Sequence, residues 1–231
     1  LHRLVGAHRH EILARYPKIL RRVGGYALDE FVNGQPFSLA RLLVGSEGTL
    51  ATTLEAKINL EPRPTPSQVA LMGVHFETMF EALESTTEIL TTGPTAIELA
   101  DKYILDLTRR SLEYARQMTF VQGDPGALLF VEYYGETPGE LVAKLDRLEA
   151  HCRRQRIGTA FTRALSPEDQ QRIWTVRKAG MALLLGMIGD KKPVAGIEDT
   201  AVAPAGFAVT ARDVRPEGRD VDHRHPGPPV G

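Results

Sequence analysis

The chain after residue 68 alternates between unbroken apolar runs and segments in which apolar residues recur every three or four positions. The first pattern is typical of buried strands, and the second is typical of helices that pack one face against a core. Strands are predicted at 69–76, 127–134, 159–165 and 193–202, and helices at 78–90, 97–118, 137–157 and 166–181. This order favours an α+β fold, with helices on one face of a largely antiparallel sheet.

Two of the predicted helices begin with strong capping signals. Thr137 is followed by proline at the first helical position and by Glu140 at the third, and Ser166 is followed by a similar Pro-Glu-Asp sequence. Such residues accept hydrogen bonds from the first free N–H groups of a helix. Gly158 is expected to end the first of these helices. His75 lies within a predicted strand and is interpreted as a core residue whose hydrogen bonds are satisfied.

The first 66 residues follow a different pattern. Helical spacing of apolar residues near the N-terminus is interrupted by Pro17, and the pair Gly24-Gly25 ends it. Residues 51–60 are rich in Thr, Leu and Ile and predict a strand. Three prolines within five residues at 62–66 favour a stiff linker, where we place a domain boundary. Residues 205–231 combine Gly, Pro and charge with almost no apolar period, which predicts a disordered or foreign tail.

One turn carries candidate chemistry. An apolar run at 41–44 enters the sequence Gly45-Ser46-Glu47-Gly48-Thr49. Glycines three residues apart let the backbone approach a ligand closely, and successive N–H groups with the Ser46 and Thr49 hydroxyls can hold a phosphate. A plain turn between two elements has the same spacing, so the turn by itself leaves both interpretations open.

Composition excludes several classes of protein. A net charge of −1 provides no overall field that would recruit nucleic acid or an anionic membrane. Cys152 is the only cysteine, which rules out a disulfide framework or a cysteine metal cluster within the chain. No apolar stretch reaches the length of about 18 residues that a transmembrane helix requires. Because the first residue is Leu1 rather than Met, we expect a fragment of a longer protein.

Two ordered sets of motifs make the pattern specific. The first is Val-Gly-Gly-Tyr-Ala-Leu at 23–28, the glycine turn at 42–50, Glu-Ala-Lys-Ile at 55–58 and the proline-rich exit. The second is Ile-Trp-Thr-Val-Arg-Lys at 173–178, Asp-Lys-Lys-Pro at 190–193 and the segment 197–204. Together they resemble FAD-linked oxidases of the glycolate oxidase, D-lactate dehydrogenase and D-2-hydroxyglutarate dehydrogenase group. The motif at 190–193 is most similar to large bacterial members that join the flavin unit to an iron–sulfur unit.

The resemblance implies a domain organisation and a cofactor. Residues 1–62 would form the end of a two-subdomain, PCMH-type FAD-binding domain. Residues 63–204 would form a truncated FAD-linked oxidase C-terminal domain, which is a ferredoxin-like α+β substrate domain with an antiparallel sheet. The cofactor would be FAD, and an iron–sulfur cluster or divalent metal would lie outside this segment. No catalytic residue is assigned, because the family's histidine-rich base motif has no counterpart here.

The resemblance also implies roles for particular residues. The glycine turn would contact the FAD pyrophosphate and ribityl chain, and the two residues after it would run beside the flavin ring. The cofactor set is Tyr26, Gly45, Ser46, Glu47, Gly48, Thr49, Leu50 and Ala51, and the substrate set is Arg177, Lys191 and Lys192. Tyr26 is equally interpretable as a core tyrosine. Arg177 would bind the substrate carboxylate, and the alternative is an exposed helix arginine. For Lys191 and Lys192 the alternative is a solvated pair in a loop.

The function implied is oxidation of a D-2-hydroxy acid of the lactate, glycolate or 2-hydroxyglutarate class, with hydride transfer to flavin and an electron acceptor outside this segment. The isolated chain is expected to be inactive and to bind FAD weakly or not at all. A cytoplasmic location is expected, and the protein could also lie at the inner membrane. The alternative is a non-catalytic ferredoxin-like interaction module that pairs through its sheet face.

Overall fold

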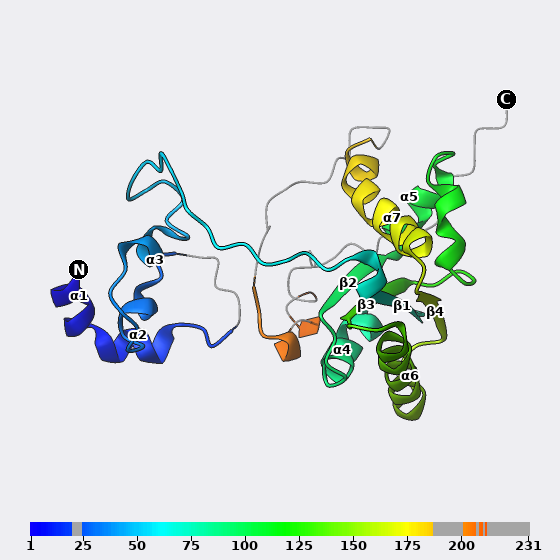
Figure 1. Ribbon diagram of the computed structural model, residues 1–231, viewed down its shortest axis with the longest axis horizontal. Coiled ribbons are helices and arrows are strands. Elements are labelled where there is room, and N and C mark those ends of the chain that lie inside the picture. The colour runs from blue at the N-terminus through cyan, green and yellow to red at the C-terminus, as the bar shows by residue number, and fades with distance from the viewer. Residues whose placement is uncertain (20–24, 187–200, 207, 210, 212–231) are drawn as a thin grey trace, which may run out of the picture.

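A computed structural model describes residues 1–19, 25–186, 201–206, 208, 209 and 211 (Figure 1). The strand predicted at 193–202 lies outside the described residues except for its last two positions, which have no regular secondary structure. Most of the tail predicted at 205–231 also lies outside them, although a short helical turn, η4 (Pro204–Gly206), is described.

Four strands form one antiparallel sheet in the described part of the chain. They are β1 (Val69–Phe76), β2 (Ala96–Asp101), β3 (Ala127–Tyr134) and β4 (Ala160–Ala164), in the spatial order β2-β3-β1-β4. β1 is antiparallel to both β3 and β4, and β2 is antiparallel to β3. Two βαβ units therefore interleave, which is the split arrangement of ferredoxin-like folds. The predicted α+β fold with an antiparallel sheet is confirmed.

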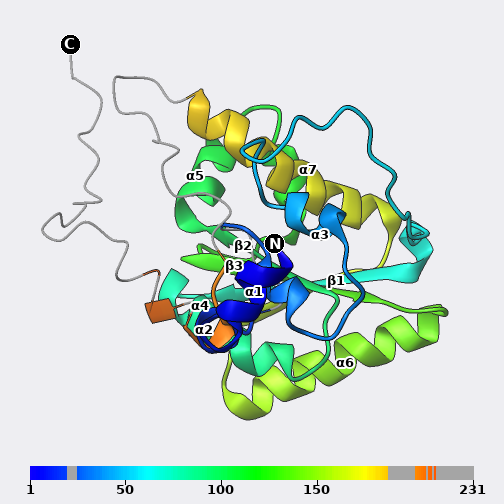
Figure 2. The ribbon, with the colours of Figure 1, turned by 90° about the vertical axis from the view of Figure 1, so that its left-hand side faces the viewer.

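Helices cover both faces of this sheet, as Figure 2 shows, with α6 and α7 on opposite sides of the strands. One core joins β1 and β3 to α4 (Met79–Leu90) and α6 (Pro138–Gln155). A second core joins them to α5 (Lys102–Arg110), the short helix η3 (Ala115–Phe120) and α7 (Pro167–Leu185). The expectation that helices cover only one face is therefore wrong. Every residue of β1 is buried, and an unbroken apolar strand is what burial on two faces requires.

The prediction of a single long helix at 97–118 is also wrong. The segment begins as β2, whose residues pair with β3, and Asp101 then caps α5 by accepting a hydrogen bond from the Ile104 N–H group at 2.9 Å. Ile97 and Leu99 pack against the core that contains α4 and α6, whereas Ala100 packs against the α7 side. Pairing with β3 thus overrides a local apolar spacing that also fits a helix.

The two capping predictions, at Thr137 and Ser166, are confirmed, and α4 has a further cap at Thr78. The side chains of Thr78, Thr137 and Ser166 each accept a hydrogen bond from the N–H group three residues later. The end of α6 differs from expectation, because the left-handed residue after the helix is Arg156, with φ 58°, rather than Gly158. Gly158 also has a positive φ, and a Cβ atom there would lie 2.6 Å from Val74 Cγ1.

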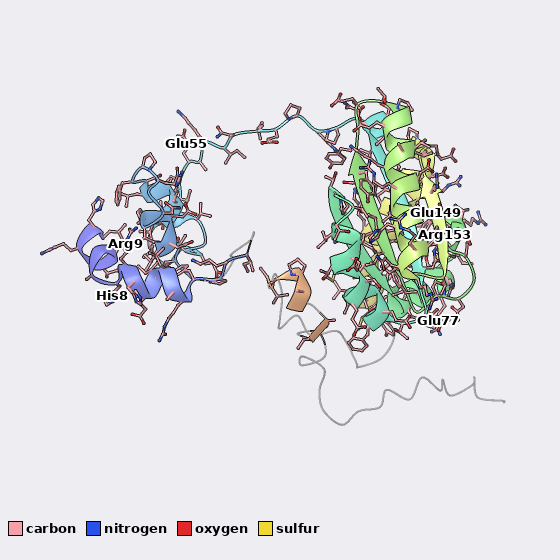
Figure 3. All side chains as sticks on the ribbon, turned by 90° about the horizontal axis from the view of Figure 1, so that it is seen from below. His8, Arg9, Glu55, Glu77, Glu149 and Arg153 are labelled. Atoms are coloured by element: carbon pink, nitrogen blue, oxygen red, sulfur yellow. The ribbon has the colours of Figure 1, made fainter. Side chains whose placement is uncertain are left out.

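The N-terminal helices form a small separate cluster. They are α1 (His2–Ala7), α2 (Arg9–Arg15), η1 (Leu28–Phe31) and α3 (Leu39–Leu43), and their buried residues are Val5, Ile12 and Val32. α2 ends at Arg15, and Tyr16 adopts an extended conformation before Pro17. Figure 3 shows this cluster, with His8 and Arg9 labelled, joined to the sheet by the long segment that carries Glu55.

The strand predicted at 51–60 does not form. These residues have no regular secondary structure, and Leu54, Ile58 and Leu60 are 94, 76 and 83% exposed. A strand needs a neighbouring strand to accept and donate its backbone hydrogen bonds, and the described residues supply none here. The next regular element is the short helix η2 (Pro66–Gln68), which leads directly into β1.

Candidate functional site

The glycine turn at 45–49 has an unusual backbone conformation. Gly45, Glu47 and Gly48 all have positive φ angles, of 79°, 48° and 74°. A Cβ atom on Gly45 would lie 3.3 Å from the carbonyl oxygen of Gly25, so two separate constraints favour glycine there. At Gly48 the space is open, and only the backbone conformation favours glycine.

A chain of hydrogen bonds joins Tyr26 to this turn. The Thr49 N–H group and hydroxyl both donate to the carbonyl oxygen of Ser46, at 2.9 and 2.5 Å. The Tyr26 hydroxyl lies 2.9 Å from the Thr49 hydroxyl oxygen and must be the donor, because the Thr49 proton is already used. The Tyr16 hydroxyl donates to the Tyr26 carbonyl oxygen at 2.7 Å. Residues that the sequence predicts for one cofactor site are therefore brought together.

The turn fits a phosphate through its backbone more than through its hydroxyls. The Ser46 side chain is buried, and the Thr49 hydroxyl bonds within the turn. The N–H groups of Glu47 and Gly48 donate no hydrogen bond to any described residue, which leaves two adjacent donors for anionic oxygens. Leu50 and Ala51 follow directly and are exposed. The donors present thus fit the oxygens of a phosphate group.

A second group of residues lies where α7 covers the sheet. Arg177 of α7 donates from Nε to Oε2 of Glu98 on β2 at 2.9 Å. The Arg177 side chain is 51% exposed and the Glu98 side chain 35%. Nη1 and Nη2 of Arg177 make no hydrogen bond or ion pair with any described residue. Arg177 is therefore half-exposed and held at one nitrogen, while its terminal fork is available to a carboxylate.

Glu132 on β3 lies on the same face of the sheet. It is opposite Ala96 in the register and 9% exposed, and it is an acidic residue within an otherwise apolar strand. Burial raises the pKa of Glu132, the charge of Glu98 acts in the same direction, and a hydrogen bond from Tyr134 opposes both. Sequence reasoning missed Glu98 and Glu132, although a single acid inside the apolar run at 127–134 was a usable signal.

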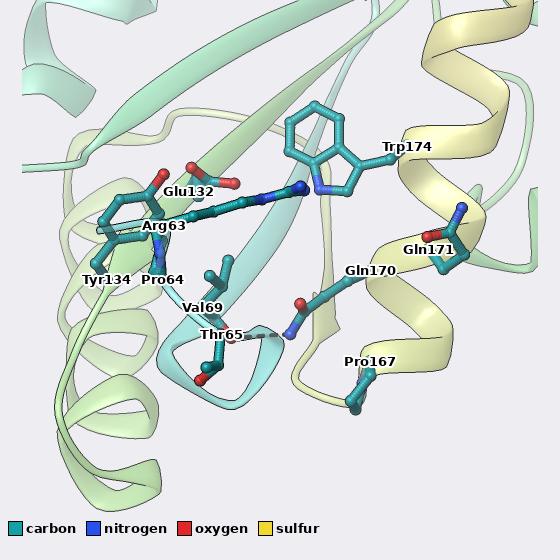
Figure 4. A pocket seen from close by; sticks show the side chains of 10 residues that line it. All are labelled: Arg63, Pro64, Thr65, Val69, Glu132, Tyr134, Pro167, Gln170, Gln171 and Trp174. Carbon is teal, nitrogen blue, oxygen red and sulfur yellow. Dashed lines mark hydrogen bonds between the residues drawn. The ribbon is translucent and has the colours of Figure 1, made fainter. Parts of the chain in front are cut away.

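A pocket of about 480 Å³ opens beside these residues (Figure 4). Its walls come from the linker before β1, the adjoining ends of β1 and β3, and the first two turns of α7. The lining residues are Arg63, Pro64, Thr65, Val69, Glu132, Tyr134, Pro167, Gln170, Gln171 and Trp174. Figure 4 shows the side chain of Arg63 extending across the pocket from the ring of Tyr134 toward the indole of Trp174. Trp174 precedes Arg177 by about one helical turn, so the two residues lie on the same side of α7.

Gln170 fixes α7 against the floor of this pocket. Its Nε2 donates to the carbonyl oxygens of Val69 and Leu165 at 2.8 and 3.2 Å, and the residue is 5% exposed. The helix that carries Arg177 is therefore tied directly to the first residue of β1. Lys191 and Lys192, the other predicted substrate residues, lie outside the described residues.

Other candidate chemistry is limited in the described part of the chain. No group of three or more His, Cys, Asp or Glu side chains is placed to hold a metal ion there. Cys152 is fully buried, and burial raises its pKa to about 11. His75 is confirmed as a core residue: its Nδ1 contacts the Ala160 carbonyl oxygen at 3.1 Å, and its Nε2 accepts from the Gln122 N–H group at 3.0 Å. None of the described helices is long and apolar enough to cross a bilayer.

The described residues form a split-βαβ domain in which Arg177 pairs with Glu98, preceded by a segment with a glycine-rich turn. The family model for the C-terminal domain of FAD linked oxidases matches residues 65–224. The match includes more than half of the chain, so the chain belongs to this family. The resemblance drawn from the sequence motifs is confirmed.

Named relatives point the same way. The chain is 30% identical to D-2-hydroxyglutarate dehydrogenase of Pseudomonas putida over 209 residues, which are 87% of this chain and 20% of the relative. The Escherichia coli protein of the same name is also 30% identical, with the same coverage. D-lactate dehydrogenase of Archaeoglobus fulgidus is 29% identical over 80% of this chain and 37% of the relative. The chain spans about a fifth of the length of the 2-hydroxyglutarate dehydrogenases.

Proposed function

We propose that this chain is part of an FAD-dependent dehydrogenase that oxidises a D-2-hydroxy acid of the lactate, glycolate or 2-hydroxyglutarate class. The names of the relatives support the reaction class. The observation that carries the proposal within this chain is Arg177, whose Nε is held by Glu98 while Nη1 and Nη2 have no partner among the described residues. A planar fork of two N–H donors matches the two oxygens of a carboxylate.

Different residues of the chain would bind the substrate and the cofactor. Arg177 would bind and orient the acid through its carboxylate, and Lys191 and Lys192 would add positive charge near it. The backbone N–H groups of Glu47 and Gly48 would hold the FAD pyrophosphate, with Tyr26 and Thr49 fixing the turn. FAD, when bound, supplies the acceptor for the hydride that leaves the substrate α-carbon.

The exposed segment at 51–60 supports the proposed division into a flavin domain and a substrate domain. From residue 54 onward its apolar residues fall at 54, 56, 58 and 60 with polar residues between them, which is the period of a strand with one buried face. Exposure of Leu54, Ile58 and Leu60 is costly in water, so we assign residues 1–62 to a PCMH-type flavin domain whose other strands would cover them. The isolated chain should therefore bind FAD weakly and be inactive.

The rival interpretation, an interaction module that pairs through its sheet face, lacks support. Both faces of the sheet are already covered by helices, so the described residues leave no open sheet face for a partner. A dehydrogenase and an interaction module also differ in their response to flavin.

The test is reduction of bound flavin. Protein expressed from the complete reading frame that contains this chain is mixed without oxygen with glycolate or with the D or L form of lactate or 2-hydroxyglutarate. The proposal expects loss of the visible absorbance of oxidised flavin with at least one of these acids, and with the D form where the acid is chiral. Failure of every acid to reduce the flavin would overturn the proposed reaction class.

A further inference from the structure

We propose that Glu98 is a positioning residue, which holds Arg177 by its Nε atom so that Nη1 and Nη2 face a ligand carboxylate. This inference rests on the proposed function of Arg177 and assigns a role to a residue on a different element. Glu98 would contact Arg177 and would not contact the ligand itself. The two residues are 79 positions apart in the sequence and meet only because the sheet and α7 pack together.

Glu98 and Arg177 both lie beside buried residues of the core, on β2 and α7. Glu98 is opposite Phe130 in the register of β2 and β3, and Phe130 is almost fully buried. Arg177 directly follows Val176, which is buried in the core between α7 and the sheet. An arginine side chain has several rotatable bonds, and the hydrogen bond at Nε restrains the orientation of its guanidinium group. The fork is thereby pre-oriented before a ligand arrives.

The geometry separates a positioning role from simple neutralisation. A carboxylate that neutralised the arginine most strongly would accept from two of its nitrogens, as bidentate pairs do. Here one oxygen of Glu98 bonds to Nε alone, and the terminal nitrogens have no partner among the described residues. The neighbouring carboxyl of Glu132 is buried and makes no ion pair with Arg177 among the described residues.

The first test is spectroscopic and needs no activity. In the ¹⁵N-labelled chain, the Nε–Hε signal of Arg177 should be protected from exchange with water, and it is assigned from its loss in Arg177→Lys. Glu98→Ala should remove this protection, whereas Glu98→Gln keeps an acceptor oxygen and should retain most of it. Glu168→Ala is the matched control, since it removes the carboxylate that bonds Arg172 at 2.6 Å on the same helix. Equal exchange in the wild type and Glu98→Ala would overturn the proposal.

The second test is binding of D-lactate and D-2-hydroxyglutarate, followed by the arginine side-chain signals against sodium chloride of equal ionic strength. Glu98→Ala should weaken binding about fivefold, the factor expected when an exposed orienting pair is lost. Glu98→Gln should bind as tightly as the wild type or more tightly, because it keeps the acceptor and removes a negative charge. Tighter binding by Glu98→Ala would show that Glu98 competes with the ligand, and would overturn the proposal.

Two outcomes distinguish the substrate contact of Arg177 from the role of Glu98. If the wild type binds neither acid at Arg177 while the Nε signal still depends on Glu98, the proposed substrate contact falls and the role of Glu98 falls with it. If the wild type binds an acid through Arg177 and Glu98→Ala binds it equally well, only the role of Glu98 is overturned.

Discussion

The hydroxyl oxygen of Tyr26 lies 2.9 Å from the hydroxyl oxygen of Thr49, although 23 positions separate the two residues. Because the Thr49 proton is donated to the Ser46 carbonyl oxygen, the tyrosine is the donor in this contact. The conformation of the glycine turn is thus linked to the residues just before η1. Tyr26 would act on a cofactor by shaping the turn.

Removing this hydrogen bond should loosen the turn. Tyr26→Phe is expected to lower the protection of the Thr49 N–H group against hydrogen exchange by about two- to fivefold, which corresponds to roughly 0.5–1 kcal/mol for a partly exposed hydrogen bond. Thr49→Val should lower this protection by a similar amount. In the double variant, the loss of protection free energy should be smaller than the sum of the two single losses. Tyr114→Phe, at a partly exposed site far along the chain, is the control. Full additivity in the double variant would contradict the contact.

Gly126 should tolerate no side chain. A Cβ atom there would overlap the carbonyl oxygen of Glu77, and the Gly126 N–H group donates to the Phe76 carbonyl oxygen at 2.9 Å. Gly126→Ala is expected to lower the free energy of unfolding by about 3 kcal/mol or more, because backbone must move at the end of β1. Gly139 lies within α6, and a Cβ atom there would meet open space. Gly139→Ala should therefore raise the free energy of unfolding by about 0.5 kcal/mol. Chemical denaturation of both variants measures the contrast, and equal stabilities would refute it.

His75 should make stability depend on pH. Burial lowers its pKa, and Nε2 accepts a hydrogen bond from the Gln122 N–H group, so the folded protein favours neutral imidazole. A group whose pKa is lowered on folding contributes stability above its unfolded pKa, which is about 6.5, and loses that contribution as the pH falls below it. The free energy of unfolding of the wild type should therefore fall between pH 7 and pH 5 relative to His75→Asn. Parallel pH profiles of the two proteins would rule this out, and His8→Asn, at an exposed site, should follow the wild type.

Cys152 should be chemically inert in the folded protein. Its thiol is fully buried, and burial raises its pKa to about 11, so the thiolate fraction near neutral pH is on the order of 10⁻⁴. Alkylation by iodoacetamide should be at least about 100-fold slower in the native chain than in denaturant. Rapid native alkylation, followed by mass spectrometry, would show that α6 opens or that the site is exposed.

Much of the fold could be predicted because its signals are local. The mainly apolar runs of β1 and β3 and the caps at Thr137 and Ser166 are properties of neighbouring residues. β2 could not be separated from α5, since six residues with apolar positions at 97 and 99 fit either period until β3 pairs with them. Residues 51–60 show the converse, because a strand pattern forms no strand without a partner.

The candidate site, like the fold, could be predicted from the sequence only in part. The glycine turn can be recognised from its sequence, since left-handed backbone favours glycine, and Arg177 is part of a motif. Glu98 could not be associated with Arg177, because their contact depends on the register of β2 and on the packing of α7 over that face. The pocket beside them likewise joins residues from the linker, two strands and a helix.

The most direct test of the whole account is the effect of Arg177→Lys on flavin reduction in protein from the complete reading frame. Lysine keeps the charge but loses the fork, so the concentration of the active D-2-hydroxy acid needed for half-maximal reduction should rise at least about tenfold, equivalent to about 1.4 kcal/mol of lost carboxylate binding. Arg172→Lys, on the same helix, should change it less than about twofold. An unchanged acid requirement in Arg177→Lys would contradict the assignment of Arg177 as the carboxylate-binding residue.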